Sequence, residues 1–172
     1  MTTLLLVRHG ETDWNAEGRL QGHTDRPLNA YGREQAKGLA VRLAGENVAA
    51  IYSSDLARAR ETAEIVGERL GLPVIVDPDL REKNWGTWEG LTSEERLGVE
   101  FEGETTEEHR DRSVRAVERI AERHPGQHIV VVTHGGSVRR IQAAVSGMAM
   151  PVVENCAVWA LAHEDGSFRP VD

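Results

Sequence analysis

Two histidines and two arginines stand at positions where their side chains could act on a phosphoryl group. His9 lies in the tripeptide R-H-G, directly after Arg8, and His134 lies in the tetrapeptide T-H-G-G. A neutral imidazole is a competent nucleophile toward phosphorus, and neighbouring arginine charges oppose its protonation. The planar guanidinium of an arginine such as Arg8 or Arg58 can hold two phosphoryl oxygens at once. These residue types together indicate phosphoryl transfer.

A carboxylic acid and a helix N-terminus would complete such a site. A protonated Glu82 could hand its proton to a departing oxygen and later take one from water. A protonated His134 could donate a hydrogen bond to a phosphate oxygen. The helix expected to begin near Gly136 would point its N-terminal amides at the same anion. None of these residues is informative alone, so the prediction depends on whether the fold brings them together.

The expected fold does so, because strands alternate with helices along the chain. This pattern predicts an α/β fold with a largely parallel sheet, in which ligands bind beyond the carboxyl ends of the strands. Arg8 directly follows the first strand, and His134 comes two residues after the strand at Ile129–Val132. Arg58 falls in the first helical turn after the second strand, and Glu82 follows the third. The expected strands are Leu4–Val7, Ala50–Ser53, Pro73–Val76 and Ile129–Val132, with two more near Ala157–Leu161 and at the C-terminus.

Helix boundaries follow from capping residues and apolar periodicity. Thr92 with Glu95, and Thr105 with Glu108, each match a capping box, which predicts that a helix begins at both places. Ser54 is expected to cap the helix after the second strand. The predicted helices are Tyr31–Ala44, Asp55–Leu70, one from Thr105 to about His124 and one from about Ser137 to Ser146.

The composition bounds the class of protein. The chain has 172 residues, of which 40% are hydrophobic and 28% charged, so we expect one soluble domain over residues 1–172. Its formal net charge of −8 gives no bulk attraction for nucleic acid or an anionic membrane. The single cysteine has no partner for an intrachain disulfide, and no apolar run approaches the roughly 18 residues of a membrane helix. We expect a cytoplasmic monomer or homodimer that binds a small phosphorylated metabolite.

Five segments resemble, in order, those of one protein family. L-V-R-H-G-E-T-D-W-N at Leu6–Asn15 resembles the signature of the histidine phosphatase superfamily, which includes the cofactor-dependent phosphoglycerate mutases. The resemblance continues through Gly18–Asn29, Tyr52–Ala63, Leu80–Gly90 and Val131–Gly136, and so covers most of the chain. It implies a three-layer α/β/α fold with a mainly parallel central sheet. It also implies an enzyme of the histidine acid phosphatase type that hydrolyses phosphomonoesters.

The resemblance implies roles for individual residues. It makes His9 the residue that is phosphorylated during turnover and Glu82 the proton donor. It implies that the reaction needs no metal and no other cofactor. It assigns phosphate binding to Arg8, Asn15, Arg58, His134 and Gly135, and substrate contacts to Gln21 and Gly22.

The segment after Gly90 departs from the family pattern. Many relatives carry a long lid there, which ends in a Pro-Gly-Gly-Glu-Ser-like stretch. In this chain Leu91–Thr106 is brief, and only Gly103–Thr105 resembles that stretch. A short lid encloses the leaving group with fewer side chains, which favours broad substrate specificity.

Other functions stay open at this point. The phosphohistidine could return its phosphate to a phosphoglycerate, as in a mutase, although L-R-E-K-N-W-G resembles the phosphatase branch. The short lid would also permit a protein phosphatase that acts on phosphohistidine or another side chain. A non-catalytic phosphate-binding module is disfavoured, because every catalytic position holds a competent residue. The two histidines could instead bind a metal with Glu82, Glu11 or Asp13, but no metal-ligand spacing supports this and the arginines would repel the ion. If Glu82 is not the acid, Glu11 or Glu89 is the next candidate.

Overall fold

Six strands form one mixed sheet in the computed structural model, which describes residues 1–171. The strands lie in the order β3-β2-β4-β1-β5-β6, and the first four in this order are parallel. β5 runs antiparallel to β1, and β6 runs antiparallel to β5. The strand bounds are β1 Thr2–Arg8, β2 Val48–Ser53, β3 Val74–Val76, β4 His128–Thr133, β5 Val158–Glu164 and β6 Ser167–Pro170.

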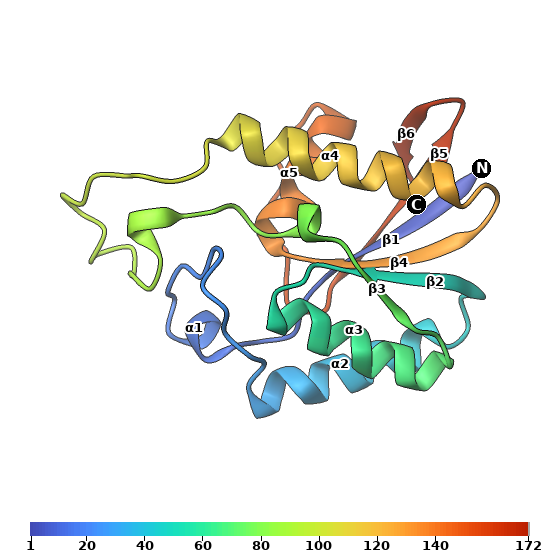
Figure 1. Ribbon diagram of the computed structural model, residues 1–172, viewed down its shortest axis with the longest axis horizontal. Coiled ribbons are helices and arrows are strands. Elements are labelled where there is room, and N and C mark those ends of the chain that lie inside the picture. The colour runs from blue at the N-terminus through green and yellow to red at the C-terminus, as the bar shows by residue number, and fades with distance from the viewer. Residues whose placement is uncertain (172) are drawn as a thin grey trace.

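Helices cover both faces of the sheet (Figure 1). α4 (Thr106–Arg123) and α5 (Gly135–Ser146) lie on one face, and α2 (Ala30–Leu43) and α3 (Ala57–Leu70) lie on the other. These helices bury apolar side chains against the strands, and the layers are held together in this way.

Alternation along β1 supplies both cores. Leu4 and Leu6 pack into the core beneath α4 and α5, whereas Leu5 and Val7 pack into the core beneath α2 and α3. A strand segment buried on both faces reads as a continuous hydrophobic run, as Leu4–Val7 does. The predicted three-layer α/β/α fold with a mainly parallel sheet is confirmed.

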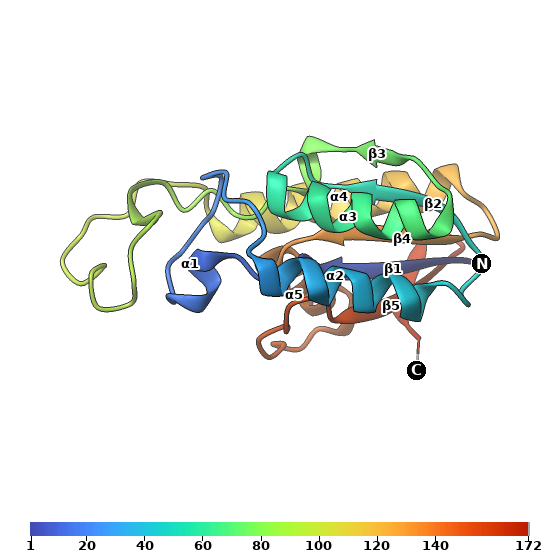
Figure 2. The same ribbon diagram turned by 90° about the horizontal axis from the view of Figure 1, so that it is seen from below.

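The carboxyl ends of the central parallel strands meet at one end of the sheet. Arg8 of β1 pairs with Thr133 of β4, and Ser53 of β2 pairs with Val132 beside it. Two long segments, 9–29 and 81–105, extend from this end, away from the N-terminus (Figures 1 and 2). The first contains the short helix α1 (Asp13–Ala16), and the second contains a 3₁₀ turn at Gly86–Trp88.

The helix predicted to begin at Thr92 is absent from the structure, so that prediction is wrong. The capping box itself forms, because Thr92 N donates to Glu95 Oε2 at 2.8 Å and Glu95 N donates to Thr92 Oγ1 at 3.3 Å. Only turns follow, and they reach Gly98, whose φ is +80°. Leu97 is 81% exposed, so no apolar face is buried to stabilise so short a helix.

The other helix starts follow the predicted caps in part. The capping box at Thr105 and Glu108 opens α4 as predicted. α3, however, has Leu56 as its N-cap, two residues beyond the predicted Ser54. Ser54 is buried, and its hydroxyl lies 2.9 Å from His134 Nε2.

None of the helices within residues 1–171 is both long enough and apolar enough to cross a bilayer.

Candidate active site

A cavity of about 180 Å³ opens at the carboxyl ends of the strands. The structure brings nearly all of the residues predicted for the site to its wall, from β1, α3, α5 and the loops between. The exception is His134, which lies behind the wall. The predicted residues that line the cavity are Arg8, His9, Asn15, Gln21, Gly22, Arg58, Glu82 and Gly135.

The backbone fixes the tautomer of His9. Its Nδ1 lies 2.6 Å from Gly10 O, and because a carbonyl oxygen only accepts, Nδ1 carries the proton and Nε2 carries the lone pair. Burial lowers the pKa of His9 well below its usual value, and the charges of Arg58 and Arg8 lower it further. Asn155 Nδ2 donates to His9 O at 2.9 Å and so holds the backbone. His9 is therefore a neutral imidazole with one nucleophilic nitrogen.

Arg8 and Arg58 each retain a buried donor. Arg58 is 1% exposed, and its terminal nitrogens donate to Gly22 O at 2.7 Å and Thr24 O at 3.0 Å. Arg8 donates to Val153 O. In the described part of the chain, neither Nε has a hydrogen-bond partner. A buried donor without an acceptor is costly. Both residues line the cavity, so an anion bound there would lie beside two guanidinium charges.

The charge of Arg58 persists despite its burial. Burial lowers the pKa of Arg58 to about 10, while the carboxylate of Glu82 acts in the opposite direction. A guanidinium with this pKa is still cationic at neutral pH. It therefore offers a fixed positive charge to a phosphate group beside His9.

Glu82 is held by two backbone amides. Gly136 N donates to its Oε2 at 2.9 Å, and Lys83 N donates to its Oε1 at 2.8 Å. A Cβ atom at Gly136 would collide with this carboxylate, so the contact requires glycine. The Gly136 amide was expected to face the bound anion, and instead it positions the carboxyl group of Glu82. The N-terminus of α5 therefore holds the carboxyl group of Glu82 in place.

His134 packs behind His9. The two ring centroids are 5.2 Å apart in an edge arrangement, and His134 is fully buried. Its Nδ1 has no hydrogen-bond partner among residues 1–171. Burial, and next the charge of Arg58, lower the pKa of His134 well below its usual value. The structure therefore favours the neutral form of His134 over the protonated donor that was expected.

Two amide side chains present donors to the cavity. Asn15 Oδ1 accepts from Thr12 N at 3.1 Å, and Gln21 Oε1 accepts from Thr12 Oγ1 at 2.7 Å. With both oxygens engaged by Thr12, the amide nitrogens of Asn15 and Gln21 are the groups left to bind a ligand. Both side chains line the cavity and suit an anion.

The carboxylate of Glu89 fastens the segment that carries Gly22 to the one that carries Glu82. It accepts from His23 N at 2.8 Å, Thr24 N at 2.9 Å and Trp85 N at 3.1 Å. A carboxylate with this many donors is occupied by the fold, and Glu89 does not line the cavity. Glu89 therefore has a structural role and is not placed to act as the alternative acid named above.

The comparison with known families decides the membership of the chain. Residues 4–172 match the model of the histidine phosphatase superfamily, branch 1. The chain belongs to the histidine phosphatase superfamily. Within residues 1–171 of this family member, no cluster of three or more His, Cys, Asp or Glu side chains could hold a metal ion.

Individual members of the superfamily are similar over most of the chain. Phosphoglycerate mutase-like protein 4 of Arabidopsis thaliana is 42% identical over 157 residues, which are 80% of this chain and 68% of the relative. A metal-independent phosphoserine phosphatase of the same plant is 38% identical, covering 85% and 69%. The structure of Bacillus stearothermophilus YhfR superposes with a TM-score of 0.92 at 36% identity, covering 99% and 95%. The family membership and the phosphoserine phosphatase relative support a hydrolase that acts on phosphomonoesters.

The sequence did not identify several residues of this histidine phosphatase site. Trp85 is an exception: Trp14, Trp85 and Trp88 flank the site segments, which predicts that at least one of them lines the cavity, and Trp85 does. Val152 and Val153, in contrast, stand in a loop without any motif. His109, which belongs to none of the family segments, lies buried against Glu82. The further residues that line the cavity are Arg19, Leu20, Trp85, Gly136, Arg139, Val152 and Val153.

The buried histidines of the histidine phosphatase fold predict a pH-dependent stability. Burial lowers the pKa values of His9, His109 and His134 in the folded state. The unfolded chain then binds protons first as the pH falls below about 6.5, so the free energy of unfolding should decrease, by up to about 1.4 kcal/mol per pH unit for each histidine. Chemical denaturation at about pH 7.5 and pH 5.5 measures this change.

Two matched variants test whether the buried histidines cause this pH dependence of the unfolding free energy. His134→Asn removes one buried titrating group and should flatten the dependence, whereas His128→Asn changes an exposed histidine and should not. Equal unfolding free energies for the wild type at the two pH values would contradict the assignment of neutral buried imidazoles.

Proposed function

We propose that this chain is a metal-independent phosphomonoesterase of the histidine acid phosphatase type, which works through a phosphohistidine on His9. The observation that carries the proposal is the orientation of His9. The hydrogen bond from Nδ1 to Gly10 O leaves Nε2 as the nucleophilic nitrogen, in a cavity that Arg8 and Arg58 line with positive charge. A neutral nucleophile among fixed positive charges suits attack on a phosphate dianion.

The first displacement forms the phosphoenzyme. The lone pair of His9 Nε2 attacks phosphorus, and the bond between phosphorus and the ester oxygen breaks. Glu82, in its protonated form, gives its proton to the departing oxygen, which leaves as an alcohol. Arg8 and Arg58 hold the equatorial oxygens, on which charge is concentrated in the transition state.

The second displacement returns the enzyme to its starting state. Glu82, now a carboxylate, takes a proton from water as the water oxygen attacks phosphorus. The bond between phosphorus and His9 Nε2 breaks, inorganic phosphate forms, and Glu82 is protonated again.

The chain acts in this scheme as one domain, a monomer or homodimer, on a small phosphorylated metabolite.

The proposal predicts that activity is independent of divalent metal. Arginines Arg8 and Arg58 already supply the positive charge that a metal would provide, and a relative is named as a metal-independent phosphoserine phosphatase. Phosphate release should survive exhaustive EDTA treatment. Vanadate, which resembles the trigonal transition state, should inhibit. Loss of activity on chelation, with recovery on adding zinc or manganese, would contradict the metal-independent scheme.

A phosphoglycerate mutase is the second candidate function. The observation in its favour is the 42% identity to a protein named phosphoglycerate mutase-like. Both functions share the phosphohistidine and differ in whether water or a second hydroxyl receives the phosphate. A panel of phosphorylated metabolites, with phosphate release and isomerisation of phosphoglycerate measured in parallel, distinguishes them. We expect phosphate release to dominate and several small phosphomonoesters to be accepted, because the lid is short.

A further inference from the structure

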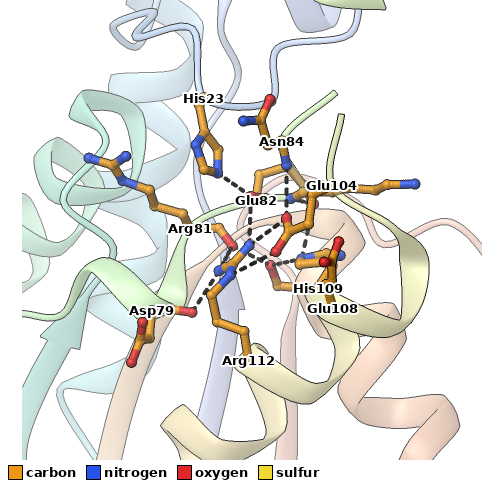
Figure 3. Close-up of polar contacts among 12 residues, drawn as sticks. His23, Asp79, Arg81, Glu82, Asn84, Glu104, Glu108, His109 and Arg112 are labelled. Carbon is orange, nitrogen blue, oxygen red and sulfur yellow. Dashed lines mark hydrogen bonds and ion pairs between the residues drawn. The ribbon is translucent and has the colours of Figure 1, made fainter. Parts of the chain in front are cut away.

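A buried histidine outside the cavity lies against the carboxyl group of Glu82 (Figure 3). His109, in the first turns of α4, is 1% exposed. Its Nε2 lies 2.9 Å from Ser137 Oγ of α5 and 3.6 Å from Glu82 Oε1. The distance to Ser137 is that of a hydrogen bond, and the distance to Glu82 is that of a close electrostatic contact. A polar ring buried at this place calls for an explanation.

The direction of the hydrogen bonds gives the tautomer of His109. The hydroxyl of Ser137 donates to Arg81 O, 3.2 Å away, because a carbonyl oxygen can only accept. Ser137 Oγ therefore accepts from His109, whose Nε2 carries a hydrogen. That N–H is also the part of the ring nearest to Glu82 Oε1. The N–H is donated to Ser137, and its partial positive charge lies 3.6 Å from the Glu82 carboxyl oxygen, a distance of electrostatic attraction and not of a hydrogen bond.

Several charged groups surround His109. Burial lowers its pKa, and the charges of Arg112 on its own helix and Arg140 on α5 act in the same direction. The carboxylates of Glu82 and Glu104 act in the opposite direction. Because burial is the largest influence, the ring is neutral at neutral pH and has a single N–H to donate.

A second residue of α4 holds the backbone around Glu82 in place. Arg112, one turn after His109, donates to Asp79 O at 2.8 Å, Arg81 O at 2.9 Å and Glu82 O at 3.2 Å. Its guanidinium also pairs with the Glu104 carboxylate at 2.8 and 2.9 Å, and both side chains are largely buried (Figure 3). The segment that carries Glu82 is therefore fixed relative to α4, and so is the distance from His109 to Glu82.

We propose that His109 is a positioning residue for Glu82, which acts by stabilising the carboxylate that forms as Glu82 loses its proton. This inference rests on the proposed function, in which Glu82 is the general acid. When the proton moves to the departing oxygen, negative charge develops on Glu82, and the His109 N–H adjoins Oε1 in a buried setting where such a contact is strong. The backbone amides of Lys83 and Gly136 already stabilise the same charge.

The test compares leaving groups in the first displacement. His109→Leu removes the N–H and replaces the ring with an apolar side chain of similar size. His109→Gln keeps an N–H donor. The measured quantity is the burst rate of enzyme phosphorylation by an alkyl phosphate and by an activated aryl phosphate. We expect H109L to slow the alkyl reaction about 10-fold, a part of what general acid catalysis contributes, and the aryl reaction about 2-fold or less. H109Q should recover most of the alkyl rate.

A double variant shows whether His109 acts through Glu82. In a Glu82→Gln background no carboxylate forms, so H109L should add no further loss, and the two effects should be strongly non-additive. Equal slowing of alkyl and aryl substrates by H109L, no recovery in H109Q, or additive losses in the double variant would overturn the positioning role. A wild-type protein that forms no phosphoenzyme would instead refute the proposed function itself.

A measurement on the wild type guards against variants that fail to fold. In ¹⁵N NMR spectra of the histidine side chains, Nε2 of His109 should be protonated and Nδ1 should not. A proton found on Nδ1 would overturn the inference, because the ring would then present a lone pair to the Glu82 carboxylate.

Discussion

Replacing His9 with alanine is expected to lower the turnover of a phosphomonoester by more than about 10³-fold, because no other side chain in the cavity can take the place of the attacking nitrogen. The fold should persist, since His9 stands at the end of β1 and belongs to neither apolar core. Steady-state kinetics gives the loss, and circular dichroism with thermal unfolding checks the fold.

A matched control for this experiment is His128→Ala. His128 is exposed, in β4, and outside the cavity, so its removal should leave turnover unchanged. Turnover in a folded His9→Ala variant that stays within about 10-fold of the wild type would contradict a nucleophilic role for His9.

Replacing Glu82 with glutamine is expected to slow the phosphorylation of the enzyme by an alkyl phosphate about 10²–10⁴-fold, the usual contribution of a general acid. The amide keeps the shape of the side chain and cannot deliver the proton. An activated aryl phosphate, whose phenolate leaves without help, should show a smaller defect in the burst. The steady-state rate for the aryl substrate should fall more than the burst, because Glu82 also activates water in the second displacement.

The control for Glu82 is Glu94→Gln, a change of an exposed carboxylate in the lid segment. Its burst rates should match those of the wild type for both substrates. If Glu82→Gln slowed the alkyl and aryl bursts by the same factor, its effect would be one of binding or fold, and the acid would have to be sought elsewhere.

The positions of the main site residues could be predicted because topology leaves them little freedom. Arg8 and His9 directly follow the apolar run Leu4–Val7, and the carboxyl ends of parallel strands meet at one edge of the sheet. Arg58 follows β2 within the first turn of α3, so its side chain reaches the same edge. The five segments that resemble the histidine phosphatase superfamily independently indicated the same site residues.

The contacts that the sequence did not reveal depend on packing between distant segments. His109 touches Glu82 only because α4 and the loop after β3 lie together, and no motif records that contact. Gly136 was expected to face a bound anion, but its amide is taken by Glu82. At Thr92 the cap was predicted correctly and the helix was not, because a cap stabilises a helix only where an apolar face is also buried.

The most direct test of the central claim is to identify the atom that carries phosphate during turnover. Wild-type protein is mixed with a phosphomonoester, quenched with base within the burst, and examined by ³¹P NMR and by mass spectrometry of its peptides. We predict an acid-labile, base-stable phosphate on Nε2 of His9, which disappears at the rate of the second displacement. Phosphate on another residue, or its release with no phosphoenzyme formed, would contradict the account.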